Sequence, residues 1–153
     1  MASTGRTSHM ELALAQARAA AARGEVPVGA VVVAADGRVL AQAGNTTRGD
    51  HDPTAHAEIV AIRAACRALG DERLIDCDLY VTLEPCAMCA AAISFARIRR
   101  LYYGASDPKG GGVEHGARVL SHPTCHHRPE IYSGLAETEA ARLLVEFFAD
   151  RRG

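Results

Sequence analysis

The chain has 153 residues, of which 48% are hydrophobic and 23% charged, and its formal net charge is −1. Such a chain is long enough to bury a core of its own and has the composition of a globular protein. We predict a disordered leader over residues 1–7 and a single domain over residues 8–153. The near-zero net charge gives no sign of a general nucleic-acid binder, although arginines in residues 96–100 and at the C-terminus favour a local basic face.

No stretch approaches the roughly 18 apolar residues that cross a bilayer. The first residues also lack the apolar segment of a signal peptide. We therefore expect a cytoplasmic protein with no membrane contact. The chain has five cysteines. An odd number in a chain without a secretion signal favours metal binding or catalysis over a disulfide framework.

The first predicted elements are a helix and a hairpin. Ser8 and Glu11 form a capping box before an alanine-rich run that stops at Gly24, which predicts a helix over about residues 9–23. β-Branched segments flank the pair Asp36-Gly37, which is a strong hairpin signal. The second strand of that hairpin is expected to end near Asn45.

The remaining elements alternate between helices and strands. The patterns predict helices over residues 55–69, 86–96 and 137–152, and strands over residues 78–83 and 97–105. Residues 106–130 are rich in Gly, Pro and His and lack a clear period, which is typical of a functional loop or of short local helices. Together these elements predict a three-layer α/β/α domain around a mixed sheet of about five strands.

A C-x-x-C motif provides two candidate metal ligands. Cys86 and Cys89 lie one turn apart on the same helix face. They stand at the start of the helix, where free N–H groups favour thiolate. By itself the motif is also compatible with two small residues in a packed helix. His56, about thirty residues earlier, adds the imidazole nitrogen that zinc takes together with sulfur. We therefore predict one zinc ion per chain.

Glu58 stands two residues after His56 at the start of a helix. Three protein ligands leave one position of a tetrahedral zinc ion open, as in catalytic sites and unlike structural ones. A carboxylate that is not itself a ligand is suited to carry a proton from water to a leaving group. Glu58 is therefore the predicted catalytic acid and base.

The order H-A-E followed by P-C-x-x-C is the signature of zinc-dependent deaminases. Over about residues 8–152 the chain resembles the bacterial tRNA-specific adenosine deaminases of the TadA type, within the cytidine and deoxycytidylate deaminase superfamily. The matching segments are EVPVGAV, HDPTAHAEI, LYVTLEPCAMCA, RIRRLYYGA and the final FF..RR. The resemblance implies the cytidine-deaminase-like α/β/α fold.

The resemblance also implies an activity. Members of that family are homodimers that hydrolyse the wobble adenosine of an arginine tRNA anticodon loop to inosine. By position, zinc would bind to His56, Cys86 and Cys89, and Glu58 would be catalytic. The base and sugar contacts would come from Val28, Asn45, the backbone N–H of Ala57, and Asp107. Without the resemblance, Asn45 and Asp107 would be ordinary turn residues.

The family pattern indicates further contacts to RNA. Candidates for phosphate contacts are Lys109, His122, His127, Arg128, Arg151 and Arg152. Each of them is also an ordinary exposed basic residue. Phe147 and Phe148 match an aromatic pair of the family, and their helical spacing places at least one in the core. The segment GGGVEHGARVL departs from the family pattern by its extra glycines and His115.

Three cysteines lie outside the predicted zinc site. Cys66 and Cys77 look like small buried residues. A second zinc site at Cys125 with the two following histidines is not expected, because adjacent residues in a loop rarely converge on one metal.

Two other functions fit parts of the pattern. A zinc deaminase of a free nucleobase or nucleoside, such as guanine, cytosine or cytidine, would use the same catalytic residues. The basic and aromatic C-terminal helix favours RNA over such a substrate. A zinc-stabilised binding module without activity is disfavoured, because a structural zinc site needs no carboxylate like Glu58.

Overall fold

The computed structural model describes residues 2–152, with side chains described over residues 9–151. A five-stranded sheet with the order β2-β1-β3-β4-β5 runs through the molecule. The strands are β1 (Gly29–Val33), β2 (Val39–Gly44), β3 (Asp78–Leu83), β4 (Arg100–Ala105) and β5 (Glu130–Tyr132). β1 is antiparallel to both β2 and β3, whereas β3, β4 and β5 are parallel. The predicted mixed sheet of five strands is confirmed.

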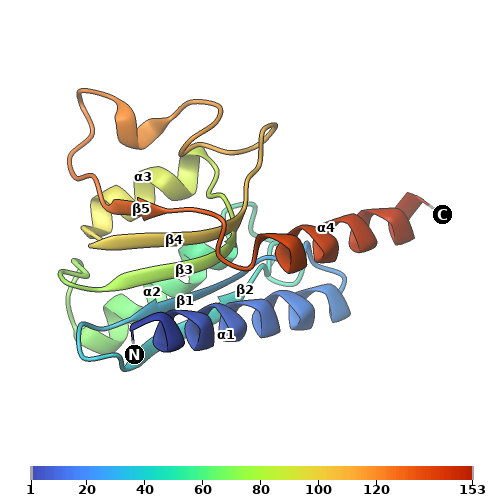
Figure 1. Ribbon diagram of the computed structural model, residues 1–153, viewed down its shortest axis with the longest axis horizontal. Coiled ribbons are helices and arrows are strands. Elements are labelled where there is room, and N and C mark those ends of the chain that lie inside the picture. Colours follow the sequence, from blue (N-terminus) through green and yellow to red (C-terminus); the bar gives the residue numbers. More distant parts are fainter. Residues whose placement is uncertain (1, 153) are drawn as a thin grey trace.

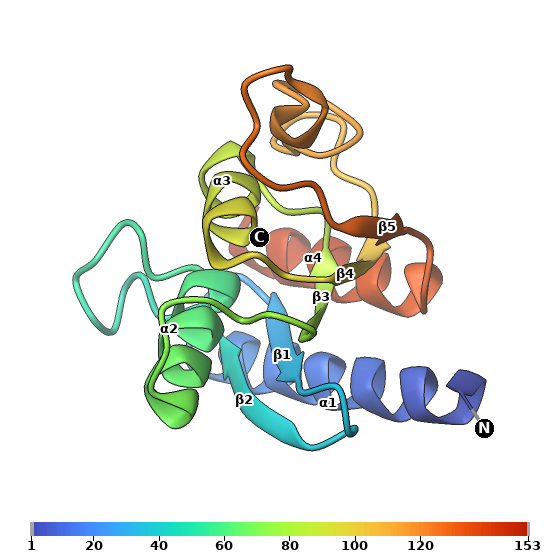
Figure 2. The ribbon, with the colours of Figure 1, turned by 90° about the vertical axis from the view of Figure 1, so that its left-hand side faces the viewer.

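Helices cover both faces of this sheet. Figures 1 and 2 show α1 (Ala2–Ala22) and α4 (Glu137–Arg152) on one side, and α2 (Ala57–Leu69) and α3 (Ala87–Ala96) on the other. Successive side chains of β1 point to opposite faces of the sheet. Ala30 and Val32 pack in the hydrophobic cluster that contains residues of α2 and α3, while Val31 packs with residues of α1. The three-layer α/β/α architecture is therefore confirmed. Within the described residues, no helix has the length and apolar character to cross a membrane.

The hairpin and the core helices follow the sequence closely. The turn between β1 and β2 is closed by a hydrogen bond from Gly37 N to Ala34 O, and Gly37 has a φ of 89°. α2 ends where Gly70 takes the left-handed conformation with a φ of 69°. At Gly29, a Cβ atom would lie 1.9 Å from the carbonyl oxygen of Ala13. Glycine there lets the backbone of α1 lie directly on β1.

Two predicted boundaries differ from the structure. α1 includes residues 2–7, so the prediction of a disordered leader and of a helix start near residue 9 is wrong. The helix extends through the serine of the predicted capping box, and no proline, which would break a helix, stands before Pro27. That serine's side chain lies outside the described ones.

The segment between β4 and β5 was predicted as a loop. It contains a short 3₁₀ helix (Val119–Ser121) and ends in β5, a strand of three residues that pairs with β4 at the sheet edge. Such a short strand leaves no periodic pattern in the sequence. The segment extends beyond the edge of the sheet at the top of Figure 1.

Candidate metal and catalytic site

Two helix N-termini meet at the carboxyl end of β3. His56 is the N-cap residue of α2 and Cys86 is the N-cap residue of α3. Both have extended backbone conformations, with ψ values of 153° and 175°, and neither side chain caps its helix. These side chains are therefore free to serve the site. Ligand sites of α/β sheets commonly lie at this end of parallel strands.

His56, Cys86 and Cys89 form a compact group. His56 Nδ1 lies 3.6 Å from Cys86 Sγ and 3.5 Å from Cys89 Sγ. Tetrahedral zinc with its usual bonds to sulfur and nitrogen separates these atoms by about 3.6 Å. Among the residues with described side chains, this is the only group of three or more His, Cys, Asp or Glu ligand atoms within 4.8 Å of one another. The donor set and its spacing fit zinc.

The electrostatics of the group suit a cation. The hydrogen bond from the Cys89 thiol lowers the pKa of Cys86 to about 4, and His56 acts in the same direction. That same hydrogen bond raises the pKa of Cys89, so the metal-free pair carries one thiolate. The hydrogen bond with Cys86 raises the pKa of His56 above its usual range. Negative charge thus accumulates on sulfur at the start of α3, where the helix N-terminus stabilises it.

Glu58 lies in the first turn of α2 and is only 4% exposed. Burial raises its pKa to about 7. A carboxyl group with a pKa near neutrality can both accept and release a proton at physiological pH. Its burial and its place beside the three candidate ligands give it the properties of a general acid and base.

His56, Glu58 and Cys86 face a cavity of about 220 Å³, the space of roughly seven water molecules. Its lining includes the predicted residues Val28, Asn45, His56, Glu58, Cys86 and Asp107, together with Val26, Leu83 and Glu84. Segments that are far apart in the sequence are thus brought together around one small cavity. This volume is below the roughly 300–1,000 Å³ of typical ligand pockets, so the cavity suits a small group.

Asn45 follows β2 and is oriented by α2. Its side-chain oxygen accepts a hydrogen bond from the Ala57 N–H at 2.9 Å. This assigns the carboxamide orientation, and the Asn45 NH₂ group has no hydrogen-bond acceptor among the described residues. The Ala57 N–H, predicted to contact the base, is therefore used by Asn45. The prediction for Ala57 stays untested, and a base would have to displace Asn45 to reach that N–H.

A second cavity of about 240 Å³ adjoins the first, because Val26 lines both. Arg48, Phe147, Phe148 and Arg151 line it. Phe147 is buried and Phe148 is 44% exposed, which confirms that at least one belongs to the core. The Arg151 guanidinium lies 3.9 Å from the centre of the Phe147 ring, a cation–π contact. The sequence analysis did not identify Arg48 as a candidate RNA contact. Its neighbours in this cavity belong to α4, about 100 residues later in the chain, so no local pattern connects them.

The buried carboxylate of Glu25 anchors the loop that carries Arg48. It is 3% exposed and accepts hydrogen bonds from Gly49 N at 2.8 Å and from Arg48 N at 3.2 Å. Burial by itself would raise the pKa of Glu25, but these hydrogen bonds hold it below its usual value. The loop that carries Arg48 is therefore fixed to the end of α1.

Other candidate RNA contacts lie elsewhere. His127 and Arg128 line a cavity with Arg99 near the amino ends of β3 and β4, opposite the catalytic cavity. The His127 ring is also hydrogen-bonded to the Ile98 carbonyl oxygen at 2.7 Å. His122 lines a groove beside α3. Lys109 is exposed close to Asp107, and the Arg152 side chain lies outside the described ones.

The other cysteines are not grouped with metal ligands. Cys77 is buried as predicted, whereas Cys66 is only partly buried. Cys125 contacts the Ser94 hydroxyl at 3.4 Å and donates to the His127 carbonyl oxygen at 3.2 Å. The Cys125 thiol is thus held between α3 and the backbone of its own loop.

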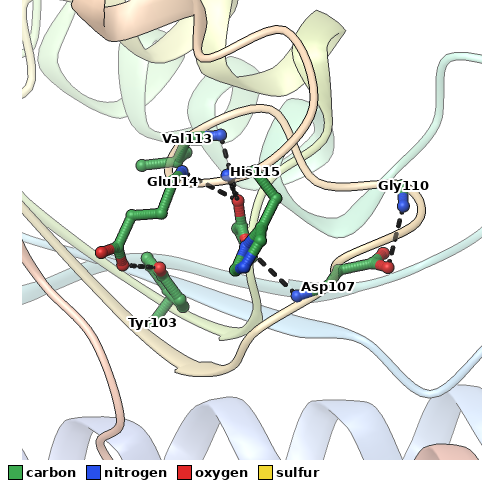
Figure 3. Close-up of polar contacts among 7 residues, drawn as sticks. Tyr103, Asp107, Gly110, Val113, Glu114 and His115 are labelled. Atoms are coloured by element: carbon green, nitrogen blue, oxygen red, sulfur yellow. Dashed lines mark hydrogen bonds and ion pairs between the residues drawn. The ribbon is translucent and has the colours of Figure 1, made fainter.

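Glu84 is a further buried carboxylate that sequence reasoning missed. It immediately follows β3 and accepts hydrogen bonds from the loop after β4 (Figure 3). Burial by itself would raise the pKa of Glu84, but the Asp107 N–H and the His115 ring hold it low. The only sequence signal was its place before Pro85 in the LEPC segment.

The comparisons with known proteins agree with this geometry. Residues 3–105 match the model of the cytidine and deoxycytidylate deaminase zinc-binding region. The chain belongs to this deaminase family. It is 67% identical over 147 residues to the tRNA-specific adenosine deaminase of Agrobacterium fabrum, covering 96% of each chain.

Solved structures show the same fold. One, from work on A-to-I editing by tRNA:A34 deaminases at the wobble position of transfer RNA, has 69% sequence identity and a TM-score of 0.88. It covers 90% of this chain, and the match spans 99% of that chain. A guanine deaminase from Bacillus subtilis is more distant, with 33% identity and a TM-score of 0.65, over 95% of this chain and 93% of its own.

Proposed function

We propose that the chain is a zinc-dependent tRNA adenosine deaminase that converts the wobble adenosine of an anticodon loop to inosine. The observation that carries this proposal is a His-Cys-Cys group and a buried Glu58 at one small cavity, which adjoins a second cavity lined by arginine and phenylalanine. The relative from Agrobacterium fabrum, with its 67% identity, supports this substrate class. We propose that residues 8–153 carry this activity as one domain.

His56, Cys86 and Cys89 would hold the zinc ion through Nδ1 and the two sulfur atoms. When bound, zinc supplies the Lewis acidity that makes water nucleophilic at neutral pH. The carboxylate of Glu58 accepts a proton from the attacking water and delivers it to the departing amine. Water and adenosine give inosine and ammonia, so Glu58 returns to its starting state after each turnover.

Three side chains position the adenosine. The free NH₂ group of Asn45 donates to a ring nitrogen of the base, since the Asn45 oxygen already accepts from Ala57. Val28 packs against the base plane from β1. Asp107 accepts a hydrogen bond from a hydroxyl of the sugar.

The adjoining cavity binds the nucleotides that flank the wobble adenosine. Phe148 is exposed and offers a ring on which a base stacks. Arg48 and Arg151 line the same cavity and contact the phosphates, with Lys109 near the mouth of the catalytic cavity. A small-molecule deaminase has no use for such a surface, which favours RNA over a free base.

We further propose a homodimer built on the outer face of α3. Phe95 is 65% exposed there and lies between two grooves. The grooves on its two sides are lined in part by the apolar residues Ile59, Ile62 and Val119, so that Phe95 belongs to a contiguous apolar patch of the kind found at protein–protein contacts. Light scattering is expected to give the mass of two chains, and of one chain for Phe95→Glu.

The decisive experiment is an inosine assay on an arginine-tRNA anticodon stem-loop, read by mass spectrometry of the nucleosides. Free adenosine, guanine and cytidine serve as competing substrates. Inosine at the wobble position alone would support the proposal. Conversion of guanine or cytidine with the stem-loop unchanged would establish the second candidate, a free-base or nucleoside deaminase, which the Bacillus subtilis guanine deaminase favours.

A further inference from the structure

Glu84 is a buried carboxylate that the proposed reaction does not use. It connects β3 to Pro85 and α3, is 2% exposed, and lines the catalytic cavity. A carboxylate in such a place is costly unless hydrogen bonds satisfy it. Figure 3 shows the loop residues of this network, with Val113 and Glu114 on the left, Asp107 and Gly110 on the right, and His115 between them.

The two oxygens of Glu84 bind the first part of this loop, over residues 107–115. Oε1 accepts a hydrogen bond from Asp107 N at 3.0 Å and contacts His115 Nδ1 at 2.7 Å. Oε2 accepts hydrogen bonds from Val113 N at 3.2 Å, Glu114 N at 2.9 Å and His115 N at 3.0 Å. Oε1 thus joins Asp107, near the start of the loop, to the His115 ring, and Oε2 binds the three consecutive backbone N–H groups of residues 113–115.

The glycines of the loop make this approach possible. A Cβ atom on Gly111 would lie 2.5 Å from Glu84 Oε2, and one on Gly112 would lie 2.4 Å from Ala87 N. The loop also closes on itself, because Gly110 N donates to Asp107 Oδ1 at 2.9 Å. The extra glycines of this sequence therefore let the loop wrap the carboxylate and orient Asp107.

We propose that Glu84 is the positioning residue that holds Asp107 and the adjoining wall of the cavity in place for the substrate. The kinetic part of this proposal rests on the proposed function, in which Asp107 contacts the sugar. The backbone N–H of Asp107 is tied to Glu84, and its carboxylate is tied to Gly110, so both ends of the residue are set before substrate arrives. Such preorganisation lowers the cost of binding.

The substitution Glu84→Gln tests the positioning role, because it removes the hydrogen bond to Asp107 and keeps the other contacts of the side chain. The glutamine oxygen still accepts from the N–H groups of residues 113–115. In the wild type His115 Nδ1 donates to Glu84, and in the variant the neutral imidazole carries its proton on Nε2, so that Nδ1 accepts from the glutamine NH₂. The same NH₂ faces the Asp107 N–H, donor against donor, so the variant releases Asp107 and little else. We expect a rise in KM for the stem-loop of tenfold or more, with kcat changed less than threefold and zinc content unchanged.

The matched control is Asp78→Asn. Asp78 is a buried carboxylate at the opposite end of β3, where it pairs with Arg99. That variant is expected to leave KM within twofold. A rise in KM of the same size in Asp78→Asn would show a general loss of stability and overturn the proposal.

A double-mutant cycle checks that the effect runs through Asp107. Asp107→Ala is expected to raise KM in the wild type, and to add less than threefold in the Glu84→Gln background. If Asp107→Ala raised KM by the same factor in the Glu84→Gln background as in the wild type, the two residues would act independently and the positioning role would be refuted.

Amide hydrogen exchange gives a readout that needs no turnover. In the wild type, the amides of Asp107 and Glu114 are expected to exchange slowly. In Glu84→Gln, the amide of Asp107 is expected to exchange at least tenfold faster, while that of Glu114 stays protected. A wild-type Asp107 amide without protection would overturn the proposal even where the variant fails to fold. An inactive wild type with protected amides would defeat the proposed function and leave the role of Glu84 standing.

Discussion

Replacing Glu58 with glutamine removes the proposed proton carrier while keeping the shape of the side chain. Proton transfer by a positioned group contributes about 10²–10⁴-fold to a rate. Glu58 acts in both directions, so the rate of a single turnover on the stem-loop is expected to fall by about 10³-fold or more. Zinc content is expected to stay at one per chain, because Glu58 is outside the group of His56 and the two cysteines.

The same substitution changes the pH dependence of stability in the metal-free chain. The pKa of Glu58 rises from 4.5 to about 7 in the folded state. Each unit corresponds to about 1.4 kcal/mol, so the shift is worth about 3 kcal/mol. The folded state binds this proton more tightly, so wild-type stability is greatest below pH 4.5 and falls as the pH rises towards 7. Glutamine has no such dependence.

The assay is urea unfolding of EDTA-treated protein between pH 5 and pH 8. Glu58→Gln is expected to gain about 2–3 kcal/mol relative to the wild type across this range. Glu72→Gln, which removes an exposed carboxylate, is the control and is expected to show neither effect. Retention of a tenth of the wild-type rate would refute the catalytic role of Glu58. A stability difference that does not change with pH would refute its buried, proton-binding state.

Further variants test the remaining assignments. Cys86→Ser is expected to lose zinc, measured by emission spectrometry of the purified protein, and one ion per chain in that variant would contradict the ligand set. Asn45→Asp keeps the acceptor for the Ala57 N–H but loses the donor to the base, so we expect near-wild-type stability with kcat/KM at least tenfold lower. Asn45→Ala also leaves that N–H unpaired and is expected to lose about 1–3 kcal/mol in urea unfolding. Equal stability of the two Asn45 variants would argue against the hydrogen bond. Arg151→Ala is expected to reduce the salt dependence of RNA binding by about 0.7–0.9 in log–log slope, and an unchanged slope would remove Arg151 from the RNA surface.

Much of the fold followed from local patterns. The hairpin at Asp36-Gly37 and the strand over residues 78–83 were predicted because turn chemistry and β-branched runs act over a few neighbours. β5 was missed because its three residues gain their strand character from pairing with β4. The start of α1 was misplaced because a capping box is a favourable helix start and does not prevent a helix from beginning earlier.

The candidate ligands and Glu58 could be predicted from the sequence, because zinc chemistry demands particular side chains at particular spacings. His56, Cys86 and Cys89 stand at helix starts, and their identities limit what they can bind. The tertiary structure decided which other residues share the cavity with them. It brought Val28, Asn45 and Asp107 to the same end of the sheet, and it placed Arg128 at the opposite end.

Glu84 shows the limit of sequence reasoning most clearly. Its neighbours in sequence are a leucine and a proline, and nothing about them indicates an anchor. Four of its five hydrogen-bond partners are backbone N–H groups that lie 23 to 31 residues away, and the fifth is the His115 ring. Backbone donors have no residue identity, so no motif can record them. The sequence by itself determined the chemistry of the site, because that chemistry resides in side chains, while the shape of the cavity depended on backbone contacts that only the folded chain creates.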